Sequence, residues 1–92
     1  MREAPIEKKV TAYAESLGWW ARKFSSPARR SVPDHIYARA GDVFFIEFKA
    51  TGKPATKAQL HEHKKIRAQG FDVYVIDNIE DGRAVFDNRR SP

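Results

Sequence analysis

The stretch from Val43 to Ala50, Val-Phe-Phe-Ile-Glu-Phe-Lys-Ala, constrains the fold more than any other part of the chain. Its β-branched and aromatic residues predict a central strand covered on both faces of a sheet. Because side chains alternate along a strand, Glu47 and Lys49 share one face and emerge side by side at its end. Ionised groups there must be paired, bind metal or open onto a cleft. This pair alone is compatible with a terminal salt bridge or with a functional site.

Size and hydropathy limit the class of protein. The 92 residues predict one domain, residues 1–92, with a core small enough that self-association would add stability. A composition of 41% hydrophobic and 32% charged residues is typical of a soluble globular domain. No hydrophobic run approaches the roughly 20 residues that span a bilayer, and the first residues lack the apolar core of a signal peptide. We therefore expect an intracellular protein with no membrane partner.

Charge and cysteine content limit the chemistry. The chain has no cysteine, which excludes disulfides, a thiolate zinc site and a cysteine nucleophile. Any metal must therefore be held by oxygen or imidazole. Seventeen Lys and Arg against twelve Asp and Glu give a net charge of +5, which favours a polyanionic partner such as nucleic acid.

The first 32 residues predict a helix, a strand and a basic loop. Apolar residues recur at helical spacing over residues 3–17, and Glu7 lies at the edge of that stripe. A glutamate there either favours the helix N-terminus electrostatically or faces a site. Residues 19–24 predict a strand whose two tryptophans are expected in the core. The loop over residues 25–32 is either simply solvated or meets an acidic partner.

A hairpin is predicted around the central strand. Pro33 fixes the backbone before a second strand over residues 34–39, and Ala40-Gly41-Asp42 forms a tight turn to the central strand. Antiparallel pairing brings together the ends far from the turn. Asp34 should therefore lie beside the end of the central strand that carries Glu47 and Lys49.

The second half predicts a helix, a strand and a short final segment. Thr56-Lys-Ala-Gln59 has the pattern of a capping box, beginning a helix that ends near Gln69. Its apolar stripe is thin, so Gln59 either only caps the helix or also points toward whatever the helix covers. Residues 72–77 predict a strand parallel to the central one, as in a βαβ crossover. Residues 82–87 predict a short final strand or turn.

Four motifs on these elements resemble a known family. They are Glu7 in the first helix, Arg-Arg-Ser-Val-Pro-Asp at 29–34, Ile-Glu-Phe-Lys-Ala at 46–50 and Gln59. Asp with a later Glu-x-Lys resembles the PD-(D/E)XK nuclease superfamily, and all four motifs together resemble its virus-type replication-repair nuclease (VRR-NUC) domain. Ser31 departs from the pattern, because the family commonly has glycine there. The resemblance implies an α/β, restriction-endonuclease-like mixed sheet flanked by helices, in the order α-β-β-β-α-β.

The chemistry of the residues agrees with the metal-dependent phosphodiester hydrolysis that the resemblance implies. Asp34 and Glu47 on adjacent strand ends form a hard-oxygen site suited to Mg²⁺ or Mn²⁺. Lys49 can orient or deprotonate the attacking water and offset charge on the phosphate. The resemblance implies a further metal ligand in the backbone carbonyl of Phe48, and Glu7 could reach the same ion directly or through water. It also implies that Gln59 orients Lys49 or the water, so the predicted catalytic residues are Glu7, Asp34, Glu47, Lys49 and Gln59.

Basic residues flank these positions and should hold DNA phosphates without reading bases; they are Lys23, Arg29, Arg30, Lys53 and Lys57. His35, His61 and His63 could bind metal in principle. His61 and His63 are two residues apart, however, and two helical residues at that spacing point in different directions. We therefore expect no histidine metal site.

The leading hypothesis is a Mg²⁺- or Mn²⁺-dependent DNA endonuclease. The family's stand-alone members are associated with phages and branched DNA, which implies action on four-way (Holliday) junctions in the cytoplasm of a bacterial or phage-infected cell. A homodimer would bury apolar surface expected on the first helix, the tryptophans and Val85-Phe86. The alternatives are a general or flap-directed nuclease, a catalytically silent DNA-binding module and a protein-interaction subunit.

Overall fold

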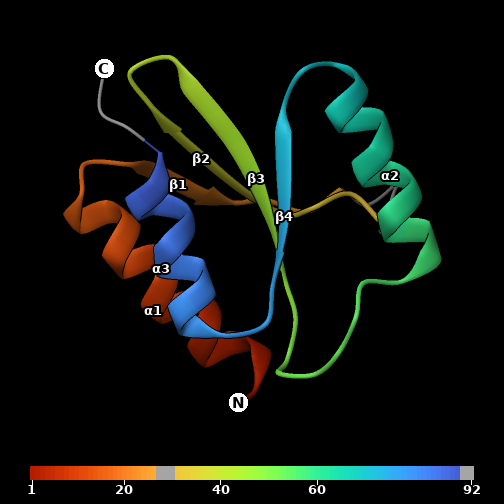
Figure 1. Cartoon of the computed structure of the whole chain (residues 1–92), viewed down its shortest axis with the longest axis horizontal. Helices are drawn as coiled ribbons and strands as arrows, with labels where there is room; N and C mark the ends of the chain where they lie inside the picture. The colour runs from red at the N-terminus through yellow and green to blue at the C-terminus, as the bar shows by residue number, and fades with distance from the viewer. Residues whose placement is uncertain (27–30, 90–92) are drawn as a thin grey trace.

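The computed structural model describes residues 1–26 and 31–89. The described chain forms a four-stranded sheet with helices on both sides (Figure 1). The elements, in chain order, are α1 (Glu3–Ser16), β1 (Trp20–Lys23), β2 (His35–Arg39), β3 (Asp42–Phe48), α2 (Lys57–Ala68), β4 (Asp72–Ile76) and α3 (Ile79–Asn88). The strand order is β1-β2-β3-β4, with β4 parallel to β3 and the other pairs antiparallel. The predicted mixed α/β fold and the parallel crossover are confirmed.

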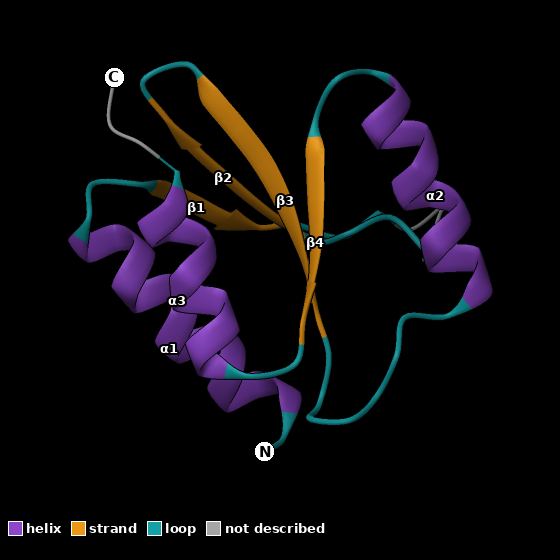
Figure 2. Cartoon of the chain, viewed as in Figure 1, coloured by secondary structure: helices purple, strands orange, loops and turns teal. Residues whose placement is uncertain are grey.

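The main core lies between one face of the sheet and two helices. Helices α1 and α3 pack together on that face, whereas α2 lies on the opposite side beside β4 (Figure 2). Alternation along β3 sends Phe44, Ile46 and Phe48 into this core, and each is at most 1% exposed. They meet the apolar residues of the two helices and the other strands, which include Ile6, Val10, Ala14, Trp19, Tyr37, Ile76 and Phe86.

The β2–β3 turn sets the register on which the candidate site depends. Arg39 pairs with Asp42, so the turn between the strands has two residues, Ala40 and Gly41. Their φ values of 50° and 85° place both in the left-handed region, as in tight hairpin turns. The same register pairs His35 with Ile46. Asp34, one residue earlier, therefore reaches the level of Glu47, as the sequence predicted.

The predicted capping box of α2 is also confirmed. The Oγ1 atom of Thr56 accepts a hydrogen bond from the Gln59 backbone N–H at 3.1 Å. In return the Gln59 Oε1 atom accepts one from the Thr56 N–H at 2.9 Å. These two bonds fix the start of α2 where the chain returns from β3.

The expectation of a final strand or turn over residues 82–87 is wrong, because this segment lies within helix α3. The Asn78 Oδ1 atom caps the helix by accepting from the Asp81 N–H at 2.8 Å. Gly82, which looks like a chain breaker in the sequence, is required by packing instead. A Cβ atom at Gly82 would lie 2.5 Å from a methyl carbon of Val10 on α1.

The expectation that both tryptophans lie in the core is wrong for Trp20, which is 48% exposed while Trp19 is buried. The reason is strand alternation, which turns Trp20 to the sheet face away from α1 and α3. On that face α2 packs against β4, so the apolar side chains of β1–β3 are only partly covered. The expectation that β3 is covered on both faces therefore holds at Glu47, which is buried, whereas Val43 and Phe45 on the same face are only half-buried. We call this surface the open sheet face; it comprises Trp20, Ile36, Ala38, Val43 and Phe45.

The surface expected to drive dimerisation also differs. Phe86 is 2% exposed, and Ile6, Val10 and Ala14 of α1 are fully buried, because α1 and α3 pack against each other and α1 packs against the sheet. Of the large apolar side chains left exposed, Trp20 belongs to the open sheet face, whereas Leu17, Leu60 and Phe71 lie outside it. Among the described residues, no helix has the length and apolarity needed to cross a membrane.

Candidate active site

A polar pocket of about 330 Å³ lies where the start of β2 meets the end of β3. Its lining includes four of the predicted site residues, Asp34, Glu47, Lys49 and Gln59, together with Glu3. Antiparallel pairing of β2 with β3 brings Asp34 close to Glu47. Gln59 comes from the capped start of α2, and Glu3 comes from the first turn of α1. The fold thus brings together residues that are distant in the sequence.

Glu47 is the most deeply buried carboxylate at this pocket. The residue is 8% exposed, and burial raises the pKa of its carboxyl from 4.5 to about 7. Lys49 opposes this rise, while the nearby carboxylates of Asp34, Glu3 and Glu7 add to it. Three acidic side chains and one lysine line the pocket, so an added cation would be favoured there.

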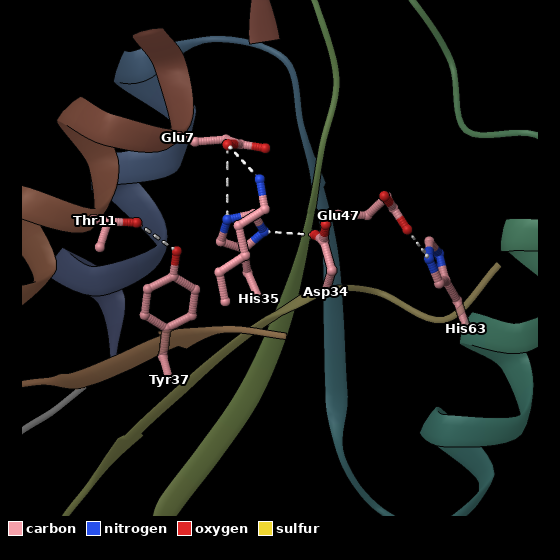
Figure 3. Close-up of polar contacts among 8 residues, drawn as sticks. Glu7, Thr11, Asp34, His35, Tyr37, Glu47 and His63 are labelled. Carbon is pink, nitrogen blue, oxygen red and sulfur yellow. Dashed lines mark hydrogen bonds and ion pairs between the residues drawn. The ribbon is translucent and has the colours of Figure 1, made fainter. Parts of the chain in front are cut away.

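Asp34 is held by the residue that follows it. The His35 Nδ1 atom lies 2.7 Å from the Asp34 Oδ1 atom, and the His35 side chain is only 6% exposed (Figure 3). Burial lowers the pKa of His35, against the effect of Asp34. The His35 ring also packs edge-on against Phe48, with centroids 4.8 Å apart. Asp34 is thus fixed through an imidazole that belongs to the core.

Glu7 and Glu3 approach from α1, one helical turn apart. Glu7 lies 3.9 Å from the His35 Nε2 atom (Figure 3). It also lies 3.4 Å from the Lys23 Nζ atom and lines a neighbouring groove between α1 and β1. Glu3, rather than Glu7, lines the site pocket, and burial together with Glu7 raises its pKa. Sequence reasoning missed Glu3, although its spacing of four residues from Glu7 puts both on one helix face.

Lys49 and Gln59 complete the pocket. The Lys49 backbone N–H donates to the Ile76 carbonyl at 2.8 Å, so the lysine is anchored just beyond the end of β3. The capping box uses the Oε1 atom of Gln59 and leaves its amide NH₂ group available to the pocket that Gln59 lines. Capping and a role in the site are therefore compatible for one side chain.

His63 is a residue whose role sequence reasoning missed. Its side chain is fully buried on α2, and its Nε2 atom lies 3.2 Å from the Glu47 Oε1 atom (Figure 3). His61 is exposed, so the two histidines point apart as predicted. The signal in the sequence was the thin apolar stripe of this helix, which forces a polar group inward at position 63.

The donor set fits a hard divalent cation in its chemistry, because carboxylate oxygens line a pocket that favours positive charge. Within residues 1–26 and 31–89, no three Asp, Glu or His side chains form a ready-made metal cluster. Asp34, Glu47 and Glu7 instead each contact a histidine or lysine. Among the predicted phosphate contacts, Lys53 and Lys57 are exposed, Lys23 pairs with Glu7, and Arg29 and Arg30 lie outside the described residues.

Comparisons with known proteins identify the family and the fold. A solved structure described as a VRR-NUC domain superposes with a TM-score of 0.86 at 26% identity, covering 96% of this chain and 97% of that one. A predicted nuclease, p44, of Acyrthosiphon pisum secondary endosymbiont phage 1 is 42% identical over 79 residues, 85% of each chain. The chain belongs to the VRR-NUC family. A second VRR-NUC structure shares the fold with a TM-score of 0.78 at 18% identity, over 95% of this chain and 86% of that one. No family model matches the chain.

Proposed function

We propose that this protein is a Mg²⁺- or Mn²⁺-dependent DNA endonuclease that hydrolyses phosphodiester bonds. The observation that carries the proposal is that Asp34, Glu47 and Lys49 line one pocket together with a further carboxylate, Glu3. Membership of the VRR-NUC family and the similarity to a phage nuclease support it. We also propose that residues 1–92 act as one domain in the cytoplasm of a bacterial or phage-infected cell, a setting that the phage origin of the relative supports.

Each residue has a defined task in this proposal. Asp34, Glu47 and the Phe48 carbonyl would hold the cation, with Glu7 completing the shell directly or through water. When bound, the cation lowers the pKa of a water molecule and polarises the phosphoryl group. Lys49 orients that water and offsets charge on the phosphate oxygens. The NH₂ group of Gln59 positions Lys49 or the water.

Glu3 has the geometry to join this set. It lines the same pocket as Asp34 and Glu47, and it stands one turn before Glu7 on α1. Its carboxylate therefore adds to the negative charge that draws a cation to the pocket. We propose that Glu3 shares with Glu7 the role that sequence reasoning gave to Glu7 alone.

DNA would be bound through its phosphates. Lys53 and Lys57 are exposed on the segment that leads into α2, next to Gln59, and the chain carries a net charge of +5. Lysines in this position give affinity that depends on salt and not on base sequence. Arg29 and Arg30 would extend the same contact, and Lys23 would exchange Glu7 for a phosphate.

We further propose a symmetric homodimer that cleaves four-way junctions. The open sheet face supports the dimer, because Trp20 is 48% exposed beside half-buried apolar neighbours on β2 and β3. A twofold dimer repeats the same patch on both subunits and sets two active sites at a fixed separation. Junction resolution needs two cuts on opposed strands, which suits that arrangement.

The test of the enzyme is cleavage of linear, flap and four-way-junction DNA in Mg²⁺ and in excess EDTA. We expect cleavage with Mg²⁺ or Mn²⁺ only, and its loss in Asp34→Ala, Glu47→Ala and Lys49→Ala while the fold persists by circular dichroism. Glu80→Ala, an exposed acid on α3, is the matched control and should cleave normally. Full activity of Asp34→Ala, or full cleavage in EDTA, would remove these residues from the mechanism. DNA binding without cleavage by the wild-type protein would favour the silent module.

The dimer has its own test. Light scattering should give a dimer at micromolar concentration, and Trp20→Glu should shift it toward monomer, because the charge would be buried at the twofold contact. Competition between a junction and a linear duplex of equal length, at moderate salt, should favour the junction. A wild-type monomer would refute the homodimer, and equal binding and cleavage of both DNAs would leave a general nuclease.

A further inference from the structure

Helix α2 buries a polar side chain where an apolar one would pack more simply. His63 is fully buried, whereas Leu60 on the same helix is 50% exposed. Burying an imidazole costs free energy unless its nitrogens find hydrogen-bond partners. The placement of His63 therefore requires a reason other than filling the space between α2 and the sheet.

The polar contact of His63 is with a candidate metal ligand. Its Nε2 atom lies 3.2 Å from the Glu47 Oε1 atom, and its Nδ1 atom has no hydrogen-bond partner among the described residues. An ionised carboxylate can only accept hydrogen bonds, so the proton of a neutral imidazole belongs on Nε2. The Nδ1 atom then carries the lone pair that has no partner among the described residues, and the hydrogen bond of the ring is the one to Glu47.

We infer that His63 is a positioning residue that fixes the carboxylate of Glu47 for cation binding; this rests on the metal site of the proposed function. A glutamate side chain has several rotatable bonds, and pinning its Oε1 atom restricts where the Oε2 atom can point. Partners of this kind orient metal ligands, and their loss typically weakens metal affinity about 10–100-fold. Gln59 lies one helical turn before His63, so a single face of α2 forms this wall of the site.

Asp34 and His35 repeat the arrangement at the start of β2, with the Asp34 Oδ1 and His35 Nδ1 atoms 2.7 Å apart. Both candidate carboxylate ligands on the sheet are thus hydrogen-bonded to a buried imidazole. His35 also packs against Phe48 and approaches Glu7, so changing it would disturb core and site together. His63 gives the cleaner test, because Glu47 is the residue with which its ring is hydrogen-bonded.

Two substitutions at position 63 separate positioning from packing. His63→Leu keeps a similar volume and removes the hydrogen bond, while His63→Gln keeps an N–H donor that can reach Glu47. His61→Leu, on the exposed side of α2, is the matched control. Each full-length variant is examined by calorimetric titration with Mn²⁺ in the absence of DNA, by cleavage against Mg²⁺ concentration, and by thermal unfolding in EDTA.

We expect His63→Leu to unfold in EDTA at or above the wild-type temperature and to bind Mn²⁺ about 10–100-fold more weakly. His63→Gln should recover most of that affinity, and His61→Leu should match wild type. If His63→Leu binds Mn²⁺ with wild-type affinity, the positioning role is overturned but the metal site is not. Equal loss of affinity in both variants together with lower unfolding temperatures would overturn it too, by assigning His63 to packing. A wild-type protein that binds no Mn²⁺ would refute the metal site itself and the positioning role with it.

Discussion

Replacing Glu47 with glutamine should stabilise the metal-free protein at alkaline pH. Burial and neighbouring carboxylates raise the pKa of Glu47 from 4.5 to about 7, so its ionised form costs about 3 kcal/mol of folding free energy above pH 7. Glutamine removes the charge but keeps a side-chain oxygen that can accept from the His63 Nε2 atom. A gain of 1 kcal/mol corresponds to about 4–8 °C in unfolding temperature for a domain of this size, and we expect at least that gain at pH 8.

The sign of the effect with pH follows from the direction of the shift. The raised pKa means that the folded protein holds the Glu47 proton more tightly than the unfolded chain does. The stability that this proton provides is complete below pH 4.5 and is lost as the pH rises to about 7. Glu47→Gln avoids this loss, so its advantage over wild type should be largest at pH 8 and small near pH 4.5.

Thermal unfolding in EDTA, followed by circular dichroism at pH 4.5, 6 and 8, measures this difference. Glu80→Gln, an exposed carboxylate on α3, is the control and should change little at any pH. Added Mg²⁺ should raise the unfolding temperature of wild type at pH 8 and leave Glu47→Gln unchanged, because a bound cation offsets the same charge. A Glu47→Gln protein less stable than wild type at pH 8, or equally shifted at every pH, would show that the buried charge carries no such cost.

Three further substitutions test other contacts. Gln59→Glu keeps the capping box, so the unfolding temperature should stay unchanged. Turnover should fall, because the added charge would disturb Lys49 and the water; normal turnover would limit Gln59 to capping. Arg89→Ala removes the hydrogen bonds that hold the pKa of Asp42 low, and should cost about 1.5–3 kcal/mol in urea unfolding at pH 7 and less near pH 3. Gly82→Ala should destabilise by about 1–3 kcal/mol despite the higher helix propensity of alanine, because its Cβ would meet Val10; a more stable variant would contradict this packing.

Much of the fold could be predicted because local patterns and tertiary structure agree. The apolar run ending in Glu47, the two-residue turn at Ala40-Gly41 and the capping box at Thr56 each specify one element or connection. Together they determine that Asp34 and Glu47 meet. Helix α3 was missed because Gly82 signals a turn in the sequence, whereas its lack of a side chain serves the approach of Val10.

The partners of the site residues could not be predicted in the same way. Which nitrogen meets Glu47 depends on the packing of α2 against β4, and a helical pattern does not specify how deeply its polar residues are buried. Glu3 enters the pocket because the first turn of α1 lies near Asp34, just before β2. Both features depend on the relative placement of two elements, which a single sequence does not reveal.

The two ends of β3 and β4 differ in how their charges are balanced. At the start of these strands, Arg89 from α3 hydrogen-bonds Asp42 and Asp72 and lowers the pKa of Asp42. At the far end of β3, burial raises the pKa of Glu47, while Lys49 lowers this pKa and the neighbouring carboxylates raise it further. Stability therefore rises with pH through the Arg89 end and falls with pH through the Glu47 end, since paired carboxylates favour the ionised form and buried ones oppose it. In sheets of this kind ligands bind beyond the carboxyl ends of parallel strands, and Glu47 lies at that end of the β3–β4 pair.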